Sequence, residues 1–374
     1  MATDCRESST ALLDEPPVMP EQPVTPEQRL KPEQPVKPEQ NDESLRDVVV
    51  SDSAAAAVVS DAGAAGGKAA RRGRREPTLT RDLIELSKPR IVMLILVTTA
   101  ASAWIAMAGP TGVSLSLLAW AVLLLGTGLV AGSAGAANQV WERVIDTLMP
   151  RTATRPLASR RRSLTLGVFA TAVSGIVGTA LLAWQFGVMP AAVGVATWAM
   201  YVLIYTPMKT RTAWNTTVGA VAGALPVFMG YTAAGGQLTD LPGLMFFGVL
   251  ACCQYPHFMA IAWLYRRQYA EAGFQMTTTV EPTGRSAAWQ SIIGTLTLAT
   301  CGVVACFAPA GELLMSPASF IMAALVMAAC WPLLKASLRF QQSPEDTRAR
   351  KMLRWSLVVL PAVLLVMTLR MIGL

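Results

Sequence analysis

Residues 114–157 read SLSLLAWAVLLLGTGLVAGSAGAANQVWERVIDTLMPRTATRPL, a long apolar run that ends abruptly in polar side chains. The apolar part, residues 114–137, is long enough to cross the hydrocarbon core of a bilayer as a helix. Asn138, Glu142 and Asp146 are spaced four positions apart, so they are predicted to share one face of a helix. The polar part places an amide, two carboxylates and two guanidinium groups after the run, at Asn138, Glu142, Asp146, Arg151 and Arg155. The stretch therefore predicts a transmembrane helix with a polar site at one membrane surface.

The oxygen atoms of Asn138, Glu142 and Asp146 suit a hard cation. Mg²⁺ in proteins usually binds one or two carboxylates together with substrate phosphates. Acidic side chains close to hydrocarbon are costly, so their presence indicates a function. We therefore expect these three side chains to hold Mg²⁺ and the arginines that follow them to bind a diphosphate, in an enzyme embedded in a membrane.

The composition agrees with a membrane protein, because 53% of the 374 residues are hydrophobic and only 15% are charged. Residues 1–80 hold ten Lys/Arg and fourteen Asp/Glu, whereas residues 81–374 hold twenty-one and ten. The positive excess belongs to the apolar part, so it indicates membrane orientation rather than nucleic-acid binding. The six cysteines lack a metal-binding spacing, and five of them lie in apolar runs, where they act as small hydrophobes.

Residues 1–78 are predicted to be a disordered cytoplasmic tail. Pro-Glu-Gln recurs with a period of six, beginning at Pro20, Pro26, Pro32 and Pro38, and an Ala/Gly-rich segment follows. Such a composition cannot bury enough apolar surface to fold. No apolar run lies near the first residue, so we expect no cleavable secretory signal. Residues 79–374 form the predicted membrane domain.

Nine apolar segments of about bilayer length make up this domain. They are residues 91–109, 114–137, 164–184, 188–206, 216–234, 243–264, 289–308, 317–335 and 355–373. Their continuous apolarity predicts helices rather than a barrel. Alternate connections lack Lys and Arg, and the others, with the N-terminal flank, hold twenty of the twenty-one basic residues. The positive-inside rule then predicts a multi-pass, all-α protein of a bacterial-type cytoplasmic (inner) membrane, with its N-terminus in the cytoplasm and its C-terminus outside.

A second polar region, with Glu271 and Glu281, follows the sixth segment. If the second and sixth spans are neighbours, both acidic regions face one cavity that opens inward. Lys209 and Arg211 end the fourth span, and Tyr205 lies one helical turn before Lys209, so a hydroxyl and an ammonium can converge on one oxyanion. Each basic residue taken alone is equally explained as an orientation signal.

His257, the one histidine in the sequence, lies inside the sixth span. An ionisable group within a membrane indicates a site, and imidazole is a common ligand of haem iron. A histidine hydrogen-bonded between two helices is the alternative.

These residues form motifs that resemble those of the UbiA-type intramembrane prenyltransferases, over about residues 80–374. The first aspartate-rich motif of that family resembles Asn138-xxx-Glu142-xxx-Asp146 with Arg151-Thr-xx-Arg155-Pro-Leu. Three further segments fit, namely Glu85-Leu-Ser-Lys88-Pro89-Arg90, Tyr205-Thr-Pro-Met-Lys209 through Arg211-Thr-xx-Asn215, and Pro256-His257-Phe258 with Arg267-Gln-Tyr269-xx-Ala272-Gly273. Pro-His-Phe and Tyr-xx-Ala-Gly resemble the branch of the family that acts on haem.

The resemblance implies nine helices around a central cavity open toward the cytoplasm. It also implies Mg²⁺-dependent ionisation of farnesyl diphosphate, with transfer of the farnesyl group to a vinyl group of haem b (protohaem IX). The product, haem O, would serve haem A and terminal oxidase biosynthesis, with a haem A synthase acting downstream.

The resemblance also assigns roles to individual residues. Asn138, Glu142, Asp146, Tyr205 and Lys209 would be catalytic, and the first three would hold Mg²⁺. The substrates would be bound by Arg90, Arg151, Arg155, Arg211, Asn215, His257 and Tyr269, with His257 facing the porphyrin.

Two positions depart from the family pattern, because Val144 and Gln268 stand where aspartate is usual. An amide brings no charge, so we expect weaker Mg²⁺ binding at the second site, with Glu271 as the replacement ligand. Three alternatives remain. They are a sister prenyltransferase acting on a quinone or chlorin, a non-enzymatic haem-binding assembly factor, and a secondary transporter, whose binding site would lie nearer the bilayer midplane.

Overall fold

The computed structural model describes residues 77–309 and 311–371, and these residues form helices without any strand. Nine helical segments in the described ranges are long and apolar enough to cross a membrane. They are α3 (Pro89–Met107), α4 (Leu117–Glu142), α5 (Leu164–Phe186), α6 to α7 (Val188–Met208), α8 (Asn215–Ala224) with α9 (Pro226–Ala233), α10 (Leu241–Leu264), α13 (Arg285–Phe307), α14 (Pro317–Gln342) and α15 (Asp346–Met371). The prediction of an all-α protein with nine spans is confirmed. The predicted tail lies outside the described residues, except for its last two.

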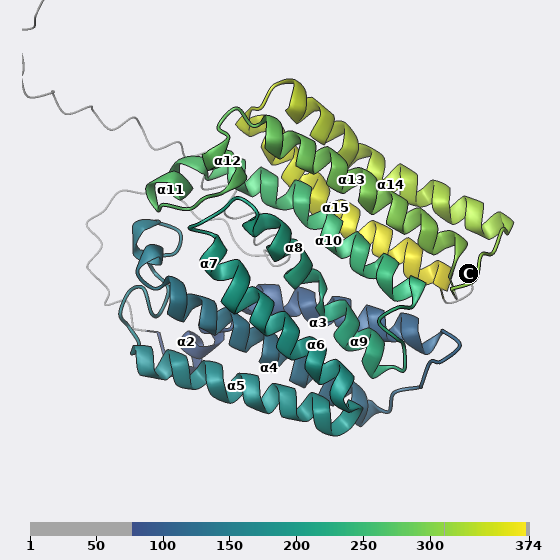
Figure 1. Ribbon diagram of the computed structural model, residues 1–374, viewed down its shortest axis with the longest axis horizontal. Coiled ribbons are helices and arrows are strands. Elements are labelled where there is room, and N and C mark those ends of the chain that lie inside the picture. The colour runs from purple at the N-terminus through teal and green to yellow at the C-terminus, as the bar shows by residue number, and fades with distance from the viewer. Residues whose placement is uncertain (1–76, 310, 372–374) are drawn as a thin grey trace, which may run out of the picture. The chain divides into compact units, whose positions relative to one another are not determined.

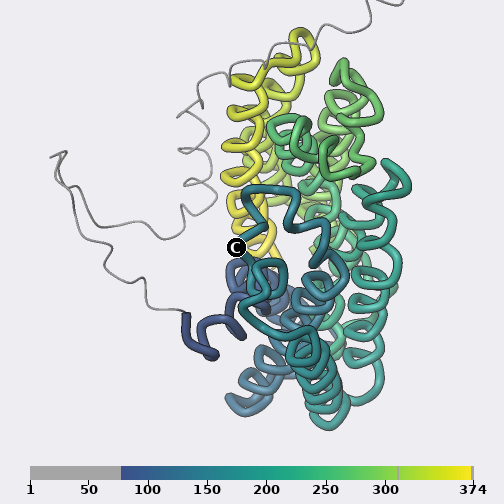
Figure 2. Tube along the Cα trace, turned by 90° about the vertical axis from the view of Figure 1, so that its left-hand side faces the viewer, coloured from purple at the N-terminus to yellow at the C-terminus, as the bar shows by residue number. Residues whose placement is uncertain are grey.

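The nine spans form one bundle, with the short helices gathered at one end (Figure 1). These are α2 (Leu79–Leu86), η2 (Ile145–Leu148), α11 (Arg266–Glu271) and α12 (Thr277–Val280). Helices α3 to α9 lie on one side of the bundle and α13 to α15 on the other, as Figure 2 also shows. Helix α10 packs against α3 and α8 on the first side and against α13 and α15 on the second. The end that carries the short helices therefore joins residues from both sides.

Helices α4 and α15 are among those that extend past their predicted apolar segments at this end. Helix α4 continues from the predicted limit, residue 137, to Glu142, and α15 starts at Asp346 instead of residue 355. Hydropathy marks only the part of a helix that lies in hydrocarbon, whereas backbone hydrogen bonding continues into polar surroundings. The extension of α4 carries the first predicted site residues.

The fourth span changes its winding before the site. Helix α6 (Val188–Ala199) passes into a π-helical segment, η3 (Met200–Tyr205), and then into α7 (Thr206–Met208). The hydroxyl of Thr206 donates to the carbonyl of Tyr201, 2.9 Å away. A π-helical turn inside a helix is frequently found at a functional site. Here it precedes Lys209.

Small residues let the chain segments at this end approach closely. A Cβ atom on Gly135 would lie 3.1 Å from the carbonyl oxygen of Ser87, and one on Gly132 would lie 3.2 Å from the Ser87 Cβ. The amide of Gln139 also donates to the carbonyl oxygens of Glu85 and Leu86, at 3.1 and 3.2 Å. Helix α4 thus fixes the turn between α2 and α3.

Helix α2 is held by an ion-pair cluster. The carboxylate of Asp82 is buried and accepts hydrogen bonds from Arg161 (3.1 Å) and Arg162 (2.6 Å). Burial would raise the pKa of Asp82, but its hydrogen bonds and ion pairs with the two arginines hold that pKa below its usual range. Asp82 therefore anchors α2 in its charged form.

Candidate active site at the end of the bundle

The first predicted motif forms a buried polar cluster. Asn138 and Glu142 lie one turn apart at the end of α4, and both are buried, as is Asp146 on η2. Glu142 Oε1 accepts a hydrogen bond from Lys209 Nζ at 2.8 Å, which joins α4 to the end of the fourth span. Ion pairs that are buried and hydrogen-bonded are screened much less than surface pairs. This cluster concentrates charge where the apolar spans end.

The prediction of one continuous helical face from Asn138 to Asp146 is wrong beyond Glu142. Helix α4 ends there, and Asp146 lies in the separate 3-10 turn η2. Arg155 Nη1 lies 2.7 Å from both carboxylate oxygens of Asp146, and the Thr152 hydroxyl donates to the Asp146 carbonyl at 2.9 Å. These contacts fold residues 146–155 into a compact loop. Asp146, which the four-residue spacing predicts to lie on the same helix as Glu142, therefore lies in a turn.

Lys209 lies between an aromatic ring and a carboxylate. Its ammonium nitrogen is 4.7 Å from the centre of the Tyr205 ring, and Gly219 leaves room for that ring because a Cβ atom there would lie 2.7 Å from it. Burial alone would lower the pKa of Lys209, but the negative charge of Glu142 outweighs this and raises it. The side chain therefore stays charged. Tyr205 contacts it through the ring face.

Lys88 and Tyr201 belong to the cluster although they were not among the predicted site residues. Lys88, at the start of α3 with a left-handed backbone (φ 54°), donates to Asn138 Oδ1 and lies 5.9 Å from the centre of the Tyr201 ring. Burial lowers the pKa of Lys88, and the charges of Arg155 and Lys209 act in the same direction. Three cations thus converge on the buried oxygens. The recognisable signals were a lysine just before a helix-starting proline and a tyrosine four residues before Tyr205.

Three loops interlock around this cluster. The hydroxyl of Tyr269, on α11, accepts a hydrogen bond from Arg151 at 3.3 Å. The buried side-chain amide of Asn215 donates to the backbone carbonyl of Gln275 at 2.9 Å. The backbone N–H of Gln275 in turn donates to the backbone carbonyl of Lys209 at 2.7 Å. The structure thus brings together the loops that follow the second, fourth and sixth spans.

Other predicted site residues lie further out. Arg90, Arg211 and Glu271 are exposed. Glu281 accepts hydrogen bonds from the amides of Thr283 and Ser286, so it caps the start of α13. His257 is partly buried on α10, and its Nδ1 lies 3.0 Å from the hydroxyl of Ser356 on α15. This contact agrees with the alternative of a histidine hydrogen-bonded between two helices.

The donor set fits Mg²⁺ chemically. Two buried carboxylates and a buried amide oxygen lie at the end of α4 and on η2. Mg²⁺ commonly takes one or two carboxylates and completes its shell with water and phosphate. Within the described residues, no three His, Cys, Asp or Glu side chains cluster as a complete metal cage. Such a site would therefore depend on the phosphate groups of a ligand.

The bundle of membrane-spanning helices and the polar cluster at one end define a class of protein, and comparison with known proteins identifies that class. Residues 95–358 match the model of the UbiA prenyltransferase family, so the chain belongs to that family. It is 67% identical over 288 residues to the protoheme IX farnesyltransferase of Rhodopirellula baltica, covering 77% of this chain and 99% of that protein.

Solved structures share the fold at low identity. Digeranylgeranylglyceryl phosphate synthase is 13% identical, with a TM-score of 0.65 over 79% of this chain and 99% of its own. A UbiA homologue from Archaeoglobus fulgidus bound to DMAPP and Mg²⁺ is also 13% identical, with a TM-score of 0.55 over 78% of this chain and 100% of its own. The bundle is therefore a prenyltransferase fold in a multi-pass membrane protein.

Proposed function

We propose that this chain transfers the farnesyl group of farnesyl diphosphate to a vinyl group of haem b, giving haem O and diphosphate. The observation that carries the proposal is the buried cluster of oxygen ligands and cations, in a chain 67% identical to a protoheme IX farnesyltransferase over almost the whole of that relative. A diphosphate that leaves an allylic carbon needs its developing negative charge stabilised, which is what preorganised cations do.

Asn138, Glu142 and Asp146 would hold Mg²⁺, which would neutralise charge on the departing diphosphate. The binding of DMAPP and Mg²⁺ by the archaeal homologue supports this assignment. Lys88, Lys209 and Arg155 would bind the diphosphate oxygens directly. Each of these cations already contacts one of the three oxygen ligands.

Other chain segments would complete the two substrate sites. Arg151 and Tyr269 would close over the diphosphate as a hydrogen-bonded pair, joined at 3.3 Å. Arg90 and Arg211, exposed at this end, would attract it by charge. Asn215 would hold the loop that carries Lys209. His257, fixed by Ser356, would face the porphyrin. Glu271 would supply the charge that Gln268 lacks at a second metal position.

We also propose the orientation that the basic connections favour, with the site facing the cytoplasm across a bacterial inner membrane and the cavity opening to that side. The substrates would then reach the site from the bilayer or the cytoplasm. A haem A synthase would use the product downstream.

Expression in cells that lack haem O synthase, followed by extraction and mass analysis of the haems, tests the proposal. We expect haem O with wild-type protein and a strongly reduced yield with Glu142→Gln, whereas Glu345→Gln, a change at an exposed carboxylate on the same end of the bundle, should leave the yield unchanged. Purified protein given haem b or quinone and chlorin acceptors identifies the acceptor class. Haem binding without a farnesylated product would overturn the proposal in favour of an assembly factor.

A further inference from the structure

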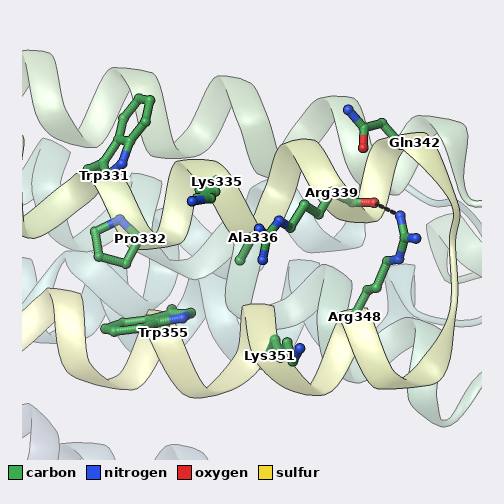
Figure 3. Close-up of a pocket in the computed structure, with 9 residues that line it drawn as sticks. All are labelled: Trp331, Pro332, Lys335, Ala336, Arg339, Gln342, Arg348, Lys351 and Trp355. Carbon is green, nitrogen blue, oxygen red and sulfur yellow. Dashed lines mark hydrogen bonds between the residues drawn. The ribbon is translucent and has the colours of Figure 1, made fainter.

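A groove of about 580 Å³ lies between α14 and α15, on the side of the bundle away from α4 to α6 (Figures 1 and 3). Four cations and two tryptophans line it, together with smaller side chains. They are Trp331, Lys335, Arg339, Arg348, Lys351 and Trp355. None of these residues takes part in the site described above.

The lining residues are ordered along the groove. Figure 3 shows Trp331 and Trp355 at one end, Lys335 and Lys351 in the middle, and the arginines beside the connection between the two helices. Helix α14 ends at Gln342, so Lys335 lies about 10 Å from that end at 1.5 Å per residue. The tryptophans therefore lie deeper toward the hydrocarbon, and the cations lie where lipid headgroups meet water.

The cations are poorly neutralised by the protein. Among the described residues, Lys335, Arg339 and Lys351 form no ion pair. Arg348 has a distant carboxylate partner, Glu345 at 3.8 Å, and donates to the Arg339 carbonyl at 2.6 Å. The other acid nearby, Asp346, is paired with Arg266. The groove thus carries a positive charge that an anion would complement.

The tryptophans supply the second half of a recognition site. Trp331 is 59% exposed and Trp355 is 40% exposed, although both are large apolar side chains. Exposed indole rings at membrane depth contact acyl chains, and their N–H groups prefer the headgroup region. An occupant needs an anionic head near the cations and an apolar chain along the rings.

We propose that this groove binds one molecule of an anionic phospholipid, with its phosphate between Lys335 and Lys351 and its acyl chain against Trp331 and Trp355. Basic pockets between transmembrane helices are known to take such headgroups. The lipid would bridge α14 and α15 at the end of the bundle where α15 extends beyond hydrocarbon. This site is separate from prenyl transfer and needs no property of that reaction.

The test uses the full chain purified in detergent and given phosphatidylglycerol or phosphatidylcholine, with lipid retention measured by native mass spectrometry. We expect one phosphatidylglycerol to be retained in preference to phosphatidylcholine. The double variant Lys335→Gln/Lys351→Gln should bind phosphatidylglycerol about 30-fold more weakly, since each cation near an anionic surface contributes about fivefold. Arg354→Gln, at an exposed arginine on α15 outside the groove, is the matched control and should bind as wild type does.

A second measurement places the acyl chain. Phosphatidylglycerol with brominated acyl chains should quench tryptophan fluorescence in the wild type, and the variant Trp331→Phe/Trp355→Phe should lose that part of the quenching while retaining the lipid. Equal retention of both lipids, equal weakening by Arg354→Gln, or full displacement of the lipid by inorganic phosphate at equal concentration would each overturn the proposal.

Discussion

One ammonium group joins the two most important helices of the site. The side chain of Lys209 (16% exposed) reaches from the end of the fourth span to that of Glu142 on α4 (5% exposed), and the two are in direct contact. Glu142 is thus the candidate metal ligand and also the counter-ion of a candidate diphosphate ligand. Removing its charge affects both roles at once.

Glu142→Gln should therefore lower the rate of prenyl transfer by about 100-fold or more, a loss of the size seen when one preorganised charge-stabilising group is removed. The measurement is product formation by protein in lipid vesicles across a range of Mg²⁺ concentrations. Equal amounts of inserted protein, checked by immunoblot, exclude a folding defect. A rate close to that of wild type would remove Glu142 from the mechanism.

Gln268→Asp should lower the Mg²⁺ concentration that gives the half-maximal rate, because a carboxylate attracts the ion where an amide offers only a dipole. The effect should be larger in combination with Glu271→Ala if the two residues share one ion, since such neighbours are not additive. If both single variants behave as wild type, the segment that includes α11 binds no metal. The first aspartate-rich motif would then act alone, with the basic side chains that contact it.

At the scale of helices, glycines on α4 determine how closely the turn formed by Ser87 and Lys88 can approach that helix. A Cβ atom on Gly135 meets backbone, whereas one on Gly128, two turns earlier on the same helix, would lie 3.7 Å from a Leu96 side-chain methyl, an ordinary contact. Backbone cannot move aside as a flexible side chain can. The same substitution should therefore have opposite consequences at the two positions.

Gly135→Ala should move Ser87 and Lys88 away from Asn138 and lower activity, about tenfold if Lys88 contributes one charged hydrogen bond of about 1.5 kcal/mol. Gly128→Ala should be neutral or slightly stabilising, because alanine favours a helix over glycine by about 1 kcal/mol. Enzyme assays and thermal unfolding of both variants compare the two. Equal activities would show that the turn does not depend on Gly135.

The anchor of α2 should depend on pH. Because the pKa of Asp82 is lowered in the folded protein, its stabilising contribution is present above the unfolded value of about 3.9 and is lost as pH falls through the folded value. Asp82→Asn should lower the melting temperature at pH 7, by an amount that corresponds to about 2 kcal/mol. The difference from wild type should shrink as pH falls below the unfolded value and vanish once pH is below the folded value. Glu85→Gln, at a carboxylate that is 41% exposed, should change little. A difference that persists at low pH would rule out this role.

At the scale of the whole molecule, the count of spans follows from hydropathy because hydrocarbon thickness fixes helix length. The sequence also pointed to Glu142, Asp146, Arg155 and Lys209, which contact one another in pairs in the structure. It did not locate Lys88, whose approach depends on a left-handed turn and two glycines, nor the end of α4 before Asp146, which depends on the contacts of Arg155 and Thr152. These are tertiary contacts, which a periodicity in the chain does not encode.

An odd number of spans places the two ends of the membrane domain on opposite sides. Reporter fusions after Arg71 and at the C-terminus should therefore report cytoplasm and exterior, respectively. A chain that starts at Arg71 should keep this orientation and its activity, because the Pro-Glu-Gln repeat lacks the apolar residues that a folded core needs. Loss of activity at normal membrane levels would show that the preceding residues contribute to function.

The π-helical segment of the fourth span affects how the length of this span compares with that of the same span in homologues. A π-helical turn holds about one residue more than an α-helical turn. If residues 200–205 were wound as an ordinary α-helix, every later position would be rotated by about 100° relative to the start of the span. Lys209 would then point away from Glu142. A homologue with a regular α-helix here should therefore be one residue shorter in this span, and a single-residue gap in an alignment at residues 200–205 would mark an unchanged site.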